Sequence, residues 1–387
     1  MAYIQKRSNG KWSYTVSLGI DPLTRKQKQK TKSGFATKKE AVSAARKVEA
    51  EIENGIFIKE TKMTFETFTQ DWIKVYAQNA KISSVRARSK EMKHFISAWG
   101  AHPLKKITKH MYQKRIVELS QKYSRNYLIG IHACGRMIFN HAVALELIKL
   151  NPTEHVQLPK YQVKIEEIEN QKEVIKFLEK EEVARFLSFT ASDGLDMDSL
   201  IFTTLAYTGL RIGELLALKW PDFDQKKKTL RVTKTLYNPT NNIKEYELLP
   251  PKTTGSIRTI RIDDQLVKMF KHHDIKQKEI KLEKGSIYVD NQFIFARNDG
   301  HPQLRKVVET RLKRILKKAN IKKNITPHSF RHTHTSLLIE AGVGVKEIQQ
   351  RLGHTDINTT MNIYAHMTAN MEEKASHQFS ELMKDLL

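Results

Sequence analysis

The sequence has a single cysteine, Cys134, in 387 residues. One thiol excludes a disulfide within the chain and a cysteine-based metal site, so we interpret Cys134 as a small buried hydrophobic residue. Apolar runs of the roughly 20 residues that span a bilayer are also missing. The opening stretch "MAYIQKRSNGKW" lacks the apolar segment of a signal peptide. We therefore expect a soluble, cytoplasmic protein that does not associate with membranes.

Nucleotide and metal motifs are absent as well, because there is no Walker glycine loop, no dinucleotide fingerprint and no HExxH. We expect no cofactor and no metal ion.

Acidic residues are few beside basic ones, with 42 Asp and Glu against 67 Lys and Arg, a net charge of +25 and a pI of about 9.8. This excess favours a polyanionic partner, most simply nucleic acid. The alternatives are general solubility and attraction to anionic lipid, and no lipidation motif or basic amphipathic anchor supports the lipid.

Residues 1–60 predict a small β-sheet followed by a helix. "KWSYTVSLGI" alternates apolar and polar residues like a half-buried strand, "DPLTRKQ" is a turn, and "KQKQKTKSGF" is a polar second strand. The helix "TKKEAVSAARKVEAEIENG" has Thr37 as its N-cap and Glu40 to complete a capping box. Residues 1–39 carry ten Lys or Arg and one acid. We expect this basic sheet to lie in a groove of DNA, and the alternative is a solvated charged face.

Residues 64–159 predict a helical unit, and residues 173–387 predict a third, mostly helical domain with strands in 229–262. Within that range, "TLRVTKTLY" and "SIRTIRI" each read as a strand. Four stretches of the helical unit have apolar residues at three- and four-residue spacing, and Ser or Thr starts each of them. A segment around 155–175 reads as an exposed linker. The expected fold class is multidomain and mainly α, with small β-sheets.

Three stretches of the third domain have side chains suited to phosphate chemistry. In "AYTGLRIGELLALKW", Gly209 ends one helix and Arg211 lies at the start of the next, a place suited to an anion. The alternative is a surface arginine paired with Glu214.

The second stretch is "ITPHSFRHTHTSLLIEAG", in which Pro327 predicts the first turn of a helix. His328 and Arg331 are three positions apart and therefore share a helix face. One titrates near neutral pH, and the other has a permanent charge on a planar donor fork. A metal site of His328 and His332 is the rival interpretation, although no nearby carboxylate or cysteine completes it.

The third stretch is "VKEIQQRLGHTDINTTMNIYAHM", in which a helix ends at Gly353 and His354 follows. Thr355 or Asp356 can cap a short helix that presents Tyr364. This tyrosine is either an ordinary packed aromatic or a nucleophile, and its own stretch does not decide between the two.

Together these stretches read R…HxxR…GH…Y, an order and spacing that resemble the tyrosine recombinase (phage integrase) family. "TGLRIGELLALKW", "HSFRHTHTS" and "LGHTDINTTMNIYAH" are close to the motif boxes of that family. The resemblance covers the whole third segment. The second segment resembles the family's core-binding domain, and the basic sheet with its helix resembles the arm-binding domain of integrases from temperate phages and conjugative transposons. Xer-type recombinases generally lack that domain, so the resemblance implies a mobile-element integrase.

The resemblance also implies roles for particular residues. Tyr364 would be the nucleophile, Arg211 and Arg331 would clamp the phosphate oxygens, and Glu214 would orient its neighbours. Lys252, in "LLPPKTTGSIRTI", matches the family's hairpin lysine, with Lys234 as its competitor. The implied catalytic set is Arg211, Lys252, His328, Arg331, His354 and Tyr364.

The function implied is that of a site-specific recombinase, which integrates and excises a phage or conjugative element through a 3′-phosphotyrosine intermediate and a Holliday junction, without metal or ATP. Its expected DNA partners are the core and arm attachment sites on duplex DNA, on which the chain forms a tetramer. Its expected protein partners are an excisionase and a host DNA-bending protein. The expected location is the cytoplasm of a bacterial host. A regulator that has lost cleavage and a type IB topoisomerase are the alternatives.

The tail "MEEKASHQFSELMKDLL" predicts an amphipathic helix that packs on its own domain or on a neighbour.

Overall fold

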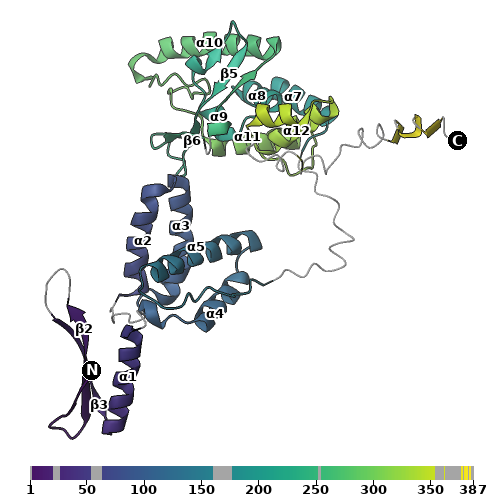
Figure 1. Ribbon diagram of the computed structural model, residues 1–387. Helices are drawn as coiled ribbons and strands as arrows, with labels where there is room; N and C mark the ends of the chain where they lie inside the picture. Colours follow the sequence, from purple (N-terminus) through teal and green to yellow (C-terminus); the bar gives the residue numbers. More distant parts are fainter. Residues whose placement is uncertain are drawn as a thin grey trace. The chain divides into compact units, whose positions relative to one another are not determined.

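The structure is a computed structural model that describes residues 2–20, 27–53, 63–159, 177–251 and 254–353, together with positions 361, 376–377, 379–381 and 383–384. The chain divides into two compact units, Met1–Lys164 and Ile165–Leu387 (Figure 1). Among the described residues, no helix combines the length and the apolarity that a bilayer span requires.

The first unit begins with a three-stranded antiparallel sheet in the order β1-β2-β3, which packs against helix α1. Tyr14 and Val16 of the central strand are buried against the helix, as the alternating pattern predicts. The first strand was not predicted, because four residues are too few to show a period. These elements are β1 (Tyr3–Lys6), β2 (Trp12–Ile20), β3 (Gln27–Phe35) and α1 (Lys38–Glu53).

The start of α1 confirms the predicted N-cap. The hydroxyl of Thr37 accepts a hydrogen bond from the backbone N–H of Glu40 at 3.2 Å. The Glu40 carboxylate accepts from the backbone N–H of Ala36, one residue before the donor that a capping box would use.

Residues 63–159 of the first unit form four α-helices, as predicted, around a core rich in aromatic rings such as Phe95, Tyr112 and Phe139. The side chains of Thr64 and Thr108 cap two of these helices. The prediction that a Ser or Thr starts each helix is wrong for α3, which has Lys81 at its N-cap, because both serines of that stretch lie inside the first turn. The elements are α2 (Phe65–Asn79), α3 (Ile82–Trp99), η1 (Leu104–Lys106), α4 (Lys109–Ser120) and α5 (Arg125–Ala144).

In its described residues, the second unit is a helical domain with two small antiparallel sheets, β4-β5-β8 and β6-β7. Its helices are α7 (Lys180–Ser192), α8 (Asp198–Thr208), α9 (Ile212–Leu216), α10 (Asp264–Lys284), α11 (Arg305–Lys318), α12 (Ser329–Glu340) and α13 (Val345–Leu352), with 3₁₀ turns η2 (Trp220–Asp222), η3 (Thr254–Ser256) and η4 (Gly285–Ile287). Its strands are β4 (Phe223–Asp224), β5 (Thr229–Val232), β6 (Thr235–Tyr237), β7 (Glu247–Leu249) and β8 (Arg258–Arg261).

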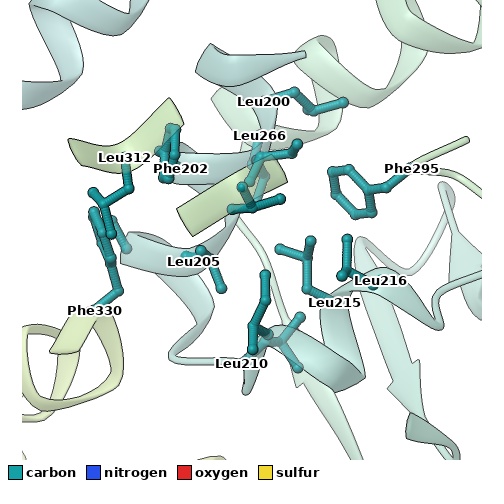
Figure 2. Close-up of a cluster of buried hydrophobic side chains, with 14 of the residues drawn as sticks. Leu200, Phe202, Leu205, Leu210, Leu215, Leu216, Leu266, Phe295, Leu312 and Phe330 are labelled. Atoms are coloured by element: carbon teal, nitrogen blue, oxygen red, sulfur yellow. The ribbon is translucent and has the colours of Figure 1, made fainter. Parts of the chain in front are cut away.

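Helix α8 is the centre of this domain, because nearly every residue in it is buried, whichever side of the helix it lies on. Phe202 of α8 packs on Phe186 of α7 and on Phe330 of α12, with ring centroids 5.3 and 5.8 Å apart. Leucines of α8, α9 and α10 complete the cluster (Figure 2). The core therefore holds the C-terminal end of α8, the start of α9 and helix α12 together.

Two local predictions are wrong. The stretch "TLRVTKTLY" was expected to be one strand, but it divides into β5 and β6, which belong to different sheets. The division falls at Lys234, whose ammonium group is held by Asp222 at 2.5 Å. Pro327 was placed in the first turn of a helix, but it precedes α12, which has His328 as its N-cap residue.

Candidate active site

The turn between α8 and α9 presents Arg211. Gly209 ends α8 in the left-handed conformation, with φ of 62°, and Arg211 is the N-cap residue of α9. A side chain at Gly209 would strain the backbone and would lie within 2.6 Å of Leu352 and 2.8 Å of the His334 ring. The turn can therefore pack this closely only with glycine at this position.

Arg331 of α12 joins this turn to the end of α13. Its side chain is buried, with 2% of the residue exposed, and it donates to the carbonyl oxygens of Gly209 at 2.9 Å and of Leu352 at 2.7 Å. Burial, and then the positive charge of Arg211, lower the pKa of Arg331 to about 9. The second and first motif stretches therefore meet, as the sequence predicts.

Glu214 lies between two arginines. Its carboxylate accepts from Arg211 Nη1 at 2.8 Å and from Arg258 Nη2 at 2.8 Å, and the backbone N–H of Arg211 also donates to it, at 3.0 Å. Burial opposes ionisation of this carboxyl, but the hydrogen bond and charge of Arg258 and the charge of Arg211 bring its pKa below the ordinary value. The pairing of Arg211 with Glu214 is thus observed, and it fixes a guanidinium whose side chain is still 40% exposed.

His328 is the N-cap residue of α12 and is exposed. Partial desolvation, and then the charges of His332, Arg331 and Arg211, lower its pKa to about 4. At neutral pH the imidazole is therefore uncharged, and a neutral imidazole can accept a hydrogen bond at one ring nitrogen.

The rival metal interpretation finds no further ligand in the described ranges. The rings of His328 and His332 meet edge to face, with centroids 5.0 Å apart. Within those ranges, no group of three or more His, Cys, Asp or Glu side chains could hold a metal ion.

The sequence did not indicate roles for three residues that support the site through hydrogen bonds: Arg258, His334 and Arg351. Arg258 Nε donates to the Arg351 carbonyl at 2.8 Å, and Arg351 Nε donates to His334 Nε2 at 3.0 Å. His334 in turn bonds through Nδ1 to the carbonyl of Ala206 at 2.8 Å. The strand pattern held a signal for Arg258, because it shares the buried face of β8 with Ile260, and a charge on a buried face needs a partner.

Three members of the predicted set, Lys252, His354 and Tyr364, lie outside the described residues, as does most of the predicted tail helix. The competitor lysine, Lys234, is described. Its ammonium group is paired with Asp222, and the two side chains are mostly buried. Lys234 therefore already has a structural role between β5 and β6.

The arrangement is suited to holding a phosphate. Arg331 donates to the carbonyl of Gly209, two residues before Arg211, so two guanidinium groups from distant parts of the chain meet at this turn. His328 is the N-cap residue of the helix that carries Arg331. Guanidinium groups form charge-assisted, often bidentate hydrogen bonds to phosphate oxygens.

Comparison with known proteins places the chain among related sequences. Residues 176–371 match the model described as "Phage integrase family", and residues 3–52 match that described as "Arm DNA-binding domain". The ICEBs1 integrase of Bacillus subtilis is 28% identical over 98% of this chain and 100% of its own length. The integrase of Staphylococcus phage L54a is 31% identical over 83% of this chain and 94% of its own length.

Two solved structures share the fold. The Tn1549 transposon integrase in complex with transposon right end DNA matches with a TM-score of 0.63 at 23% identity, over 82% of this chain and all of that chain. The lambda integrase tetramer bound to a Holliday junction matches with a TM-score of 0.56 at 17% identity, over 93% and 94% of the two chains. The predicted fold class, mainly α with small sheets, is confirmed.

Proposed function

The chain belongs to the phage integrase family, and from this premise we propose that it integrates and excises a mobile DNA element by strand exchange through a 3′-phosphotyrosine intermediate and a Holliday junction. It is a tyrosine recombinase of the integrase type, as the resemblance in its motifs indicated. The observation that carries the proposal is the bridge from Arg331 to the carbonyl of Gly209, because it places Arg331 against the turn that presents Arg211.

In this proposal Arg211 and Arg331 bind the non-bridging oxygens of the scissile phosphate. A phosphodiester has one negative charge, and attack at phosphorus adds charge to the equatorial oxygens. Fixed guanidinium groups stabilise that added charge, and they need not reorganise because Glu214 and two backbone carbonyls already hold them. Arginines in these positions do the work that a metal ion does in other phosphoryl-transfer sites, which supports catalysis without metal.

We assign the proton transfers and the covalent step to the remaining residues of the set. The Tyr364 oxygen forms a bond to phosphorus while the bond to the deoxyribose 5′-oxygen breaks. Neutral His328 accepts the phenol proton, Lys252 gives a proton to the leaving oxygen, and His354 positions the phosphate. The phosphotyrosine ester keeps the energy of the broken bond, so the 5′-hydroxyl of a partner strand can attack it without ATP.

The domain organisation fits two kinds of DNA site. We assign residues 1–60 to arm sites, residues 64–159 to the core site, and residues 173–387 to catalysis. Four strands must be exchanged, so we propose a tetramer, which is the state of lambda integrase on a Holliday junction. Excisionase and a host DNA-bending protein would be its accessory partners, in the cytoplasm of a bacterial host.

A nicked duplex with the element's attachment site tests the proposal. A nick a few bases from the scissile phosphate releases the short 5′-hydroxyl strand, so rejoining stops and a covalent adduct accumulates on a denaturing gel. We expect an adduct with the wild type and none with Tyr364→Phe. No adduct with the wild type would instead support a regulator. Relaxation of supercoils without strand exchange would support a topoisomerase, and an adduct that persists in Tyr364→Phe would remove the nucleophile assignment.

A further inference from the structure

Arg258 is a buried arginine at the start of β8, and the side chain is only 6% exposed. It donates to both oxygens of Glu214, with Nη2 at 2.8 Å and Nη1 at 3.3 Å. It also donates to the carbonyls of Ser256, at 3.2 Å from Nη1, and of Arg351, at 2.8 Å from Nε. One side chain therefore holds a carboxylate and two backbone carbonyls that come from three separate segments.

The Arg351 carbonyl lies at the C-terminal end of α13, which carries the negative end of the helix dipole. The next carbonyl, that of Leu352, accepts from Arg331. Two guanidinium groups thus bind consecutive carbonyls at one helix end. The turn that follows α13 packs tightly against the Arg258 side chain, since a Cβ at Gly353 would lie 3.2 Å from Cδ of Arg258.

We place Arg258 as a support for Arg211 and not as a phosphate ligand, because its guanidinium group is paired with a carboxylate, to both oxygens of which it donates. Its partner Glu214 is also the group that fixes Arg211, through the 2.8 Å bond between Oε1 and Nη1. A shift of Arg258 would therefore move Glu214 and with it Arg211, and would release the end of α13 from β8.

We propose that Arg258 is a positioning residue, which fixes Arg211 through Glu214 and aligns the end of α13 with Arg331. This inference rests on the proposed function, since it concerns the cleavage step. Arg258 acts through two other arginines and makes no contact with the reacting atoms. Its loss should slow the covalent step at saturating protein while DNA affinity is preserved, because Arg258 reaches no exposed phosphate.

The test compares Arg258→Met and Arg258→Lys by the rate of adduct formation on the nicked duplex at saturating protein, with DNA affinity measured separately by gel shift. Displacement of a catalytic group by about 1 Å costs on the order of 100-fold in rate, so we expect a loss of that size for Arg258→Met. We expect about 10-fold for Arg258→Lys, which keeps the charge near Glu214 but cannot also donate to the Arg351 carbonyl. The dissociation constants should change by less than about threefold, because phosphate contacts set DNA affinity.

A double-mutant cycle separates positioning from general destabilisation. If Arg258 acts through Arg211, then Arg258→Met should cost much less in an Arg211→Lys background than in the wild type. Asp198→Asn is the matched control, because it breaks a buried ion pair with Arg311 and Arg314 at the other end of α8. It should lower the melting temperature and leave the adduct rate at saturation unchanged.

The outcomes distinguish this inference from the proposed function. If the wild type forms an adduct and both Arg258 variants form it at the same rate, this inference alone is wrong. Additive losses in the cycle would overturn the positioning of Arg211 by Arg258, because the two residues would then act independently of each other. If the wild type forms no adduct, the proposed function fails and the inference fails with it. Should Arg258→Met not fold, the cycle is run with Arg258→Lys.

Discussion

His334 makes the stability of the second unit depend on pH. The residue is 7% exposed, its Nδ1 bonds to the Ala206 carbonyl, and its Nε2 accepts from Arg351 Nε. Protonation would put a hydrogen on Nε2, directly against a guanidinium group. Burial, and then the charge of Arg351, lower the pKa of His334 from 6.5 to about 3.

The direction and size of this pH dependence follow from the difference between the pKa of His334 in the folded chain and in the unfolded chain. The folded pKa lies below the unfolded pKa, so the unfolded chain binds more protons between pH 6.5 and about 3. The stabilisation that neutral His334 gives to the folded state is fully present above pH 6.5. It is lost as the pH falls toward the pKa of His334 in the folded state. From pH 6.5 to pH 5 is 1.5 pH units, and at about 1.4 kcal/mol per unit the loss is about 2 kcal/mol. For a domain of this size that corresponds to a fall of roughly 4–8 °C in melting temperature.

Scanning calorimetry at pH 7 and pH 5 measures this loss in the wild type and in His334→Asn. The asparagine amide nitrogen can overlay Nδ1 and keep the bond to Ala206, but it does not titrate. If the scan shows more than one unfolding transition, the transition whose melting temperature changes with His334→Asn at pH 7 belongs to the second unit. That transition is then compared at the two pH values. Other groups titrate equally in both proteins, so the wild type should lose about 2 kcal/mol more than the variant on acidification. Equal losses in the two proteins would refute the assignment of a buried neutral imidazole.

Three further predictions concern the same domain. Glu214→Gln leaves the Arg258 charge buried without its carboxylate, and urea unfolding should show a loss of about 3–5 kcal/mol, whereas a loss below about 1 kcal/mol would contradict this pairing. Phe330→Ala opens a cavity in the aromatic cluster and should cost about 3–5 kcal/mol in the same assay, with normal stability counting against the packing described. Lys252→Met should stop adduct formation on the nicked duplex while Lys234→Met, which breaks a structural ion pair, should retain it, and the reverse result would exchange the two lysines.

The helices and the apolar faces were predictable from the sequence because they depend on local periodicity. Tyr14 and Val16 are buried where the alternating pattern placed them, and Thr37 caps its helix. The failures came from tertiary contacts. β1 has too few residues to show a period, and the expected strand over 229–237 divides because Asp222 holds Lys234.

The candidate site shows the same division. Arg211, His328 and Arg331 could be identified because their spacing matches a family pattern. The structure links them, since Arg331 donates to the carbonyl of Gly209 in the turn that presents Arg211, and His328 is the N-cap residue of the same helix as Arg331. His334 and Arg351 could not be identified, since their roles depend on carbonyls far away in the sequence, such as those of Ala206 and Tyr207. The roles of Lys252, His354 and Tyr364 stay predictions.

The two carbonyl bonds of Arg331 have a consequence for chains that are still being made. One acceptor, the Gly209 carbonyl, is synthesised more than a hundred residues before the arginine, and the other, the Leu352 carbonyl, is synthesised after it. A ribosome-bound or truncated chain that ends before α13 therefore lacks one of the two groups that hold this guanidinium. Under the proposed function such a chain also lacks Tyr364, so neither the phosphate clamp nor the nucleophile is complete until α13 and the residues after it have been synthesised.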